Sequence, residues 1–157
     1  MTTETETSTD AITREIVVRA PRARVWRALT DSQEFGRWFR ARLSAPFVAG
    51  ERALGRVAQP GYEHLTFEVF VERMEPERLF SWRWHPYPAD PRRDYSQEPT
   101  TLVVFELEDV PEGTRVRVTE SGFDRIPLER RAEAFRMNAQ GWAQQVENLA
   151  EHVGQPG

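Results

Sequence analysis

The chain contains neither cysteine nor lysine, and all 21 of its basic residues are arginine. The absence of cysteine excludes disulfides, thiol nucleophiles and thiolate ligands for haem or iron–sulfur clusters. The absence of lysine excludes a Schiff base to a carbonyl substrate, a pyridoxal-phosphate anchor and the lysine of a phosphate-binding P-loop. Catalysis by this chain would therefore depend on acid–base work by carboxylate, histidine or tyrosine side chains.

Long apolar runs are also missing, because no segment approaches the ~18 residues that span a bilayer. The first ten residues, MTTETETSTD, lack the basic start and the apolar stretch of a secretory signal. Acidic residues number 25 against 21 basic ones, so the net charge of −4 gives no overall field that attracts nucleic acid. We expect a soluble, cytoplasmic protein with no membrane insertion and no nucleic-acid partner.

Motifs for common cofactors are absent as well. The sequence has no GxGxxG, GxxxxGK[ST], HExxH or GxSxG motif, and its three histidines are widely separated. We therefore predict no cofactor and no metal.

A length of 157 residues corresponds to one domain. The polar composition at both ends predicts a disordered tail over residues 1–11 and a second tail over 154–157, with a single domain between them at 12–153. Within it, β-branched and alternating segments bounded by turn residues predict strands, and Ala20-Pro21 and Thr30-Asp31-Ser32 each open a short helix. The predicted strands cover residues 12–19, 43–48, 52–58, 64–74, 78–85, 101–108 and 114–121.

Residues 127–153 carry the spacing of one long amphipathic helix. Its apolar stripe consists of Leu128, Phe135, Trp142, Val146, Leu149 and Val153. Gly141 lies within this helix, where we expect it to allow the close approach of a strand or of the first helix. Since strands and helices do not alternate, the pattern favours an antiparallel sheet that curls around this helix and leaves a cavity between them.

Several short motifs resemble a known family. They are REIVVRAPRARVWRALTDSQEFGRWF (14–39), EPERLFSW (75–82), GTR (113–115), ESGF (120–123) and the Gly141-Trp142 pair. The chain is similar to the C-terminal-domain-like family of the activator of heat-shock-protein-90 ATPase homologue, within the SRPBCC (START and birch-pollen-allergen-like) superfamily. The resemblance implies an α+β helix-grip fold: a curved antiparallel sheet of about six to seven strands around a long C-terminal helix, with two short helices after the first strand.

Aromatic residues are concentrated on the predicted inward faces of the sheet and the helix. They are candidate ligand-binding residues, and the alternative is that each simply packs in the core. The set consists of Phe67, Phe80, Trp82, Trp84, Phe105, Phe135 and Trp142.

Two titratable residues are the catalytic candidates. Glu120 shares strand parity with Val116 and Val118, so it faces inward if they do, unless it lies at the rim beside an arginine. His85 begins the proline-rich segment 85–99, which is long for a loop inside a domain and is either a lid over the cavity or a surface turn. Tyr87, Arg93 and Tyr95 are the lid candidates.

The leading hypothesis is a small protein that binds a hydrophobic or aromatic molecule in the cavity between sheet and terminal helix. Two alternatives stay open. One is an interaction module like the chaperone activator, with a protein partner or a second copy of the chain. The other is a metal-free hydrolase, cyclase or dehydratase that uses Glu120 or His85 as an acid–base group.

Overall fold

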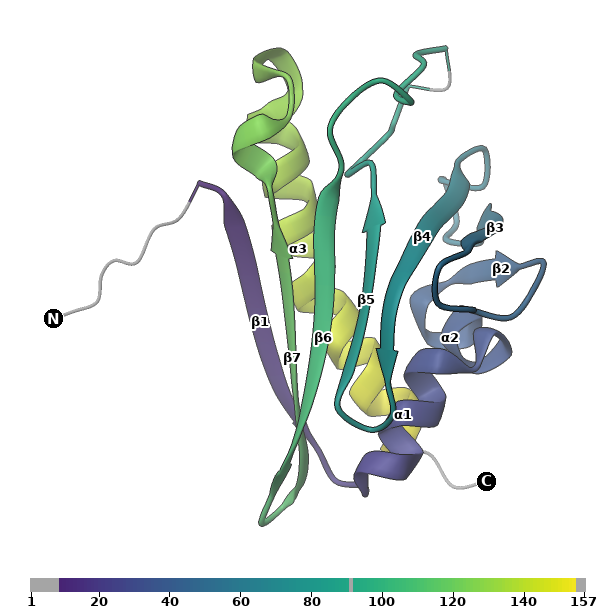
Figure 1. Ribbon diagram of the computed structural model, residues 1–157, viewed down its shortest axis with the longest axis vertical. Coiled ribbons are helices and arrows are strands. Elements are labelled where there is room, and N and C mark those ends of the chain that lie inside the picture. Colours follow the sequence, from purple (N-terminus) through teal and green to yellow (C-terminus); the bar gives the residue numbers. More distant parts are fainter. Residues whose placement is uncertain (1–8, 91, 155–157) are drawn as a thin grey trace, which may run out of the picture.

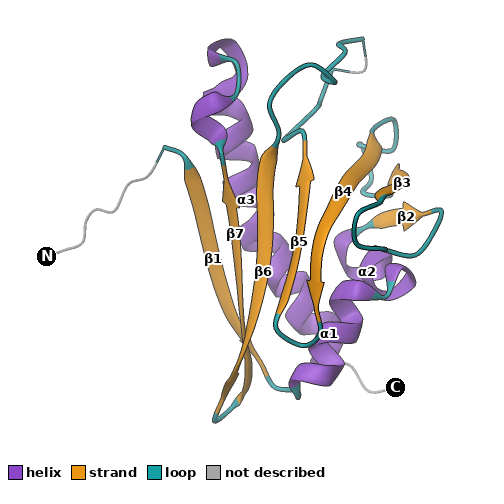
Figure 2. Cartoon of the chain, in the orientation of Figure 1, coloured by secondary structure: helices purple, strands orange, loops and turns teal. Residues whose placement is uncertain are grey.

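Seven antiparallel strands form one curved sheet in the order β1-β7-β6-β5-β4-β3-β2, and the longest helix crosses one face of it (Figures 1 and 2). The computed structural model describes residues 9–90 and 92–154, so most of the two predicted tails lies outside the described residues. The elements in chain order are β1 (Ala11–Val18), α1 (Arg22–Thr30), α2 (Ser32–Phe39), β2 (Ala41–Leu43), β3 (Arg52–Val57), β4 (Thr66–Glu75), β5 (Leu79–Trp84), β6 (Thr101–Val110), β7 (Gly113–Ser121), the 3-10 turn η1 (Phe123–Arg125) and α3 (Leu128–Gly154).

The predicted fold class is confirmed: an α+β helix-grip arrangement with two short helices after the first strand. α3 runs diagonally behind the sheet and reaches α1 and α2 at its C-terminal end (Figure 1). Trp142, Val146, Leu149 and Val153 are buried, as the helical stripe predicts. Leu128 is 77% exposed, so its assignment to the stripe was wrong: the first turn of α3 projects beyond the end of β7 (Figure 1).

One of the predicted strands is misplaced. The strand expected at 43–48 is wrong, because β2 ends at Leu43. Pro46 has no N–H for a ladder, and the chain turns there so that Phe47 is buried against Phe35 and Phe80. After β7, Gly122 adopts a φ of +105°, a conformation open to glycine, and directs the chain into η1.

The two short helices fill one end of the groove between sheet and α3. Asp31 begins α2 by accepting hydrogen bonds from the backbone N–H groups of Gln33 and Glu34, which confirms the predicted break at this point. Phe35 is fully buried, with its ring 5.7 Å from that of Trp82 on β5. α2 therefore closes this end of the groove with aromatic packing.

A cluster centred on Glu34 joins the three helices. Its carboxylate accepts from Arg24 at 2.8 Å and from Arg27 at 2.7 Å, both on α1, and lies 2.9 Å from Nε2 of His152 on α3. Burial alone would raise the pKa of Glu34, but the hydrogen bonds from His152, Arg27 and Arg24 outweigh it and lower the pKa from 4.5 to about 2. The charged form of Glu34 therefore stabilises the packing of the helices.

The change Glu34→Gln tests this cluster. Because the pKa is lower in the folded chain than in the unfolded one, Glu34 stabilises the fold above pH 4.5, and this contribution disappears as the pH falls toward 2. We expect the variant to lose up to about 3 kcal/mol of unfolding free energy at pH 7. The difference from wild type should shrink steadily between pH 5 and pH 2, approximately the window set by the two pKa values. Urea unfolding at each pH measures it.

The exposed Glu112→Gln serves as the control, with almost no difference from wild type at any pH. A destabilisation by Glu34→Gln that stays constant across the same pH range would contradict this account.

Candidate functional site

A cavity of about 340 Å³ lies between α3, the strands β3 to β5 and the loop that follows β5. Its sheet side is mainly apolar and aromatic, whereas α3 contributes a row of amide side chains. The lining residues are Phe39, Arg40, Val57, Gln59, Tyr62, Leu65, Thr66, Phe67, Glu68, Trp84, His85, Tyr87, Pro88, Asn138, Gly141, Gln144, Gln145 and Asn148. An apolar cavity with a few polar groups is the usual form of a small-molecule site.

A smaller recess of about 160 Å³ adjoins this cavity, and we refer to it as the side pocket. It is lined by Phe39, Trp84, Asn138, Gly141, Trp142 and Gln145, five of which also line the main cavity. Three of its six residues are aromatic, so its lining is chemically suited to contact an aromatic ring.

Gly141 faces open space. A Cβ atom added at this position would meet no atom within 4 Å, so the expected role in allowing a close approach of another element was wrong. Since Gly141 lines both the cavity and the side pocket, its missing side chain leaves volume in both. Glycine inside a helix costs about 1 kcal/mol relative to alanine, and here that cost coincides with open cavity space.

Glu120 on β7 is fully buried, so it faces inward, and the alternative position at the rim is wrong. Oε1 accepts from the indole N–H of Trp142 at 2.8 Å, and Oε2 accepts from that of Trp84 at 2.8 Å. Thr101 Oγ1 donates to Oε2 at 2.5 Å, and Asn138 Nδ2 lies 3.0 Å from Oε1 and 3.2 Å from Oε2. Both oxygens are thus saturated with donors, as a buried carboxylate requires.

This network places Glu120 behind the cavity wall. Glu120 does not line the cavity, but its partners Trp84 and Asn138 do, and Trp142 lines the side pocket. The carboxylate therefore fixes the orientation of three wall residues. In this geometry Glu120 is a positioning residue.

The second catalytic candidate, His85, does line the cavity. Its Nε2 atom lies 3.1 Å from the main-chain oxygen of Glu98. His85 is not among the hydrogen-bond partners of Glu120, so the structure does not join the two candidates in an acid–base pair.

The predicted ligand-binding aromatics separate into two groups. Phe67 and Trp84 line the cavity, and Trp142 lines the side pocket. The others line neither space: Phe80, Trp82 and Phe105 are at most 1% exposed within the core, and the ring of Phe135 lies 5.1 Å from that of Phe123.

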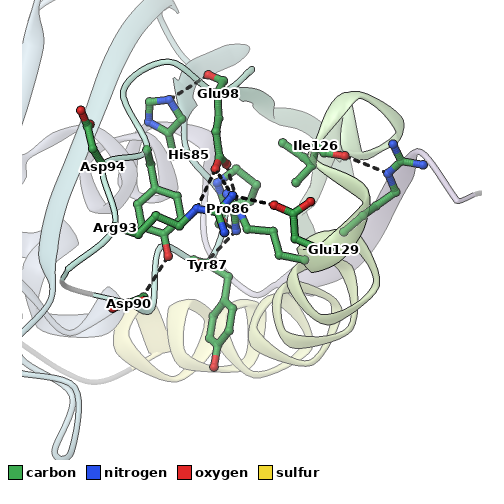
Figure 3. Close-up of polar contacts among 12 residues, drawn as sticks. His85, Pro86, Tyr87, Asp90, Arg93, Asp94, Glu98, Ile126 and Glu129 are labelled. Carbon is green, nitrogen blue, oxygen red and sulfur yellow. Dashed lines mark hydrogen bonds and ion pairs between the residues drawn. The ribbon is translucent and has the colours of Figure 1, made fainter.

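The loop after β5 is tied to the start of α3. Arg93 donates to Glu98 at 2.6 Å and to Glu129 at 2.9 Å, and Arg130 donates to Glu98 at 2.9 Å (Figure 3, where Arg93, Glu98 and Glu129 are labelled). The Arg130 guanidinium also lies 4.6 Å from the centre of the Tyr95 ring. The hydrogen bonds to Glu129 and Glu98 raise the pKa of Arg93.

The lid candidates occupy different positions in this loop. Tyr87 lines the cavity, and burial followed by the charge of Glu133 raises the pKa of its phenol. Arg93 and Tyr95 instead line an outer, more polar pocket of about 390 Å³. Of the three, Tyr87 is therefore the one placed to contact a molecule in the main cavity.

Sequence reasoning missed the amide row on α3: Asn138, Gln144, Gln145 and Asn148. Three of these residues, with Gly141, recur at helical spacing over 138, 141, 145 and 148, beside the apolar stripe. Uncharged amides at such spacing, in a helix otherwise rich in Glu and Arg, were a signal that could have found this wall.

Across the described ranges 9–90 and 92–154, no three His, Asp or Glu side chains gather in a set that could hold a metal ion. Within the same ranges, no helix combines the length and the apolar character needed to cross a membrane.

The change Glu120→Ala tests the buried network. It leaves the donors of Trp84, Asn138 and Trp142 without their acceptor, so we expect a loss of about 3 kcal/mol or more in unfolding free energy. Glu106→Ala, an exposed carboxylate on β6, is the control and should change stability by less than about 0.5 kcal/mol. Urea denaturation followed by tryptophan fluorescence measures both. Equal effects of the two changes would show that the network contributes little.

Several solved structures share the fold of this chain. Among solved structures, protein MLL2253 from Mesorhizobium loti has a TM-score of 0.72 and 23% identity, covering 91% of this chain and 96% of that one. DynU16, a protein in the dynemicin biosynthetic locus, has a TM-score of 0.71 and 26% identity over 92% of this chain, which spans 47% of DynU16. The Aha1 dimer from Colwellia psychrerythraea has a TM-score of 0.67 and 20% identity, covering 91% and 95% of the two chains.

A search of curated proteins found no match. The family model described as "Activator of Hsp90 ATPase homolog 1-like protein" matches residues 19–154, which is nearly all of the described structure. The chain therefore belongs to the Activator of Hsp90 ATPase homolog 1-like family, as its motifs indicate.

Proposed function

We propose that this protein binds one small, mostly apolar aromatic molecule in the cavity between the sheet and α3. The observation that carries the proposal is the 340 Å³ cavity itself, whose wall includes Phe39 at the end of α2 and Phe67 and Trp84 on the sheet. Its volume lies within the usual range of ligand pockets. The loop after β5 contributes His85, Tyr87 and Pro88 to the wall, so a bound molecule would be covered from that side.

One of the similar structures supports a small-molecule ligand. DynU16 is described as a protein in a biosynthetic locus, and it shares the fold over 92% of this chain.

The polar groups favour binding over acid–base catalysis. Both oxygens of Glu120 already accept hydrogen bonds from protein donors, and Nε2 of His85 contacts the main chain of Glu98. A general acid or base must reach the reacting atom of a substrate within hydrogen-bond distance, and Glu120 lies behind the wall.

Tryptophan fluorescence tests the proposal directly, because Trp84 lines the cavity and Trp142 lines the side pocket. A panel of aromatic compounds, polyketide-like compounds and lipids should include members that quench this emission and raise the melting temperature. Ligand at 100 times its Kd adds about 2.7 kcal/mol of stability. A complete panel without either effect would contradict the proposal.

A pair of changes at Gly141 locates the binding site. Gly141→Leu places a branched side chain in open cavity space, so we expect at least tenfold weaker binding, or about 1.4 kcal/mol, of any ligand found by the panel. Gly141→Ala is the matched control: both changes improve helix propensity by up to about 1 kcal/mol, but alanine leaves most of the volume open. Titration calorimetry compares them. Equal affinity of the two variants would place the ligand elsewhere.

A second candidate function follows from the family itself, whose description names an activator of the Hsp90 ATPase. If this chain acts in that way, adding it to Hsp90 should raise the rate of ATP hydrolysis. If the rate of ATP hydrolysis is unchanged and a ligand binds in the cavity, the activator function is excluded and ligand binding is retained.

A further inference from the structure

The side pocket contains four side chains that form hydrogen bonds: Trp84, Asn138, Trp142 and Gln145. The two indole N–H groups are occupied, because each donates to Glu120 at 2.8 Å. An indole has no second polar hydrogen and no acceptor, so neither ring offers a hydrogen bond to a ligand.

Gln145 is held at both ends of its amide. Its Nε2 donates to the main-chain oxygen of Phe39 at 2.9 Å, and its Oε1 accepts from Asn148 Nδ2 at 3.1 Å. Because a main-chain oxygen accepts only, these contacts fix which way the Gln145 amide points.

Asn138 differs from the other three. The ionised Glu120 carboxylate can only accept hydrogen bonds. The side-chain nitrogen of Asn138 therefore faces it as a donor, and the amide oxygen points elsewhere. Among the described residues, none donates a hydrogen bond to Oδ1 of Asn138. Glu120 is fully buried and Gln145 Oε1 already has a donor, so among the side chains of the side pocket Oδ1 of Asn138 is the oxygen that is open to a hydrogen bond from a ligand.

We propose that Asn138 Oδ1 accepts a hydrogen bond from a hydroxyl group of the ligand, so that the site selects hydroxylated aromatic compounds over their ethers. The ring of the ligand would lie among Phe39, Trp84 and Trp142, with its hydroxyl toward Asn138. This inference rests on the proposed function and specifies its ligand class.

The same geometry disfavours an anionic group at this position. A ligand carboxylate would meet the amide oxygen of Asn138, with the Glu120 carboxylate directly behind it. A phenol-type hydroxyl donates a hydrogen bond without adding charge, so it is the group that this wall accepts.

The test compares 2-naphthol with 2-methoxynaphthalene by titration calorimetry on the full chain. The two share a ring system, but only the naphthol donates a hydrogen bond, and we expect it to bind about tenfold more tightly. The ether is the more apolar compound, so a wall that offered only apolar contacts would bind it at least as well.

Two failures are therefore distinguishable. Equal or tighter binding of the ether overturns the selection by Asn138 and leaves the proposed function standing. Binding of neither compound overturns the selection as well, and the proposed function falls with it only if the wider panel also fails to bind.

A substitution at Asn138 tests whether the preference for the hydroxyl compound depends on this amide. Asn138→Leu removes the acceptor, and we expect the affinity ratio of the two compounds to fall from about ten to about one. Gln140 is an exposed amide on the same helix and does not line the cavity, so the control Gln140→Leu should keep the wild-type affinity ratio of the two compounds. Circular dichroism checks that both variants fold. If Asn138→Leu does not fold, the wild-type comparison of the two compounds still decides the proposal.

Discussion

The buried carboxylate of Glu120 is the interaction on which the organisation of the site depends. It lies on β7 and takes hydrogen bonds from Trp84 on β5, Thr101 on β6, and Asn138 and Trp142 on α3. Four donors from three elements meet at one group that would otherwise be costly to bury. The terminal helix is thereby fixed in rotation and position against the sheet, and the wall of the cavity is fixed with it.

The cavity follows from how aromatic packing is distributed along the groove between the sheet and α3. At the end near α1 and α2, the rings of Phe35 and Phe47 occupy the space over Trp82 and Phe80. At the other end neither α1 nor α2 lies over the sheet, and Gly141 of α3 contributes no side chain. The groove is therefore full at one end and open at the other, where the loop after β5 is anchored to α3 by its ion pairs.

Sequence periodicity predicted the faces of these elements well. Helical spacing placed Trp142 and Leu149 in the core, whereas strand parity left Glu120 open between an inward position and the rim, which the structure decides in favour of the inward one. Parity does not say how far along a face the packing extends, which is why Phe80 and Trp82 share a face with Trp84 yet lie outside the cavity. The spacing of the amides on α3 could have marked Asn138 as a wall residue, but it does not reveal the contact with Glu120, which is 18 residues away in sequence and becomes a neighbour only through folding.

The most direct test of the central claim is a crystal structure of this protein with 2-naphthol at saturating concentration. The account predicts density for one ring system in the cavity, beside Trp84 and Gly141, with its hydroxyl oxygen within hydrogen-bond distance of Asn138. An empty cavity under these conditions, or a ligand bound only on the outer surface, would contradict it.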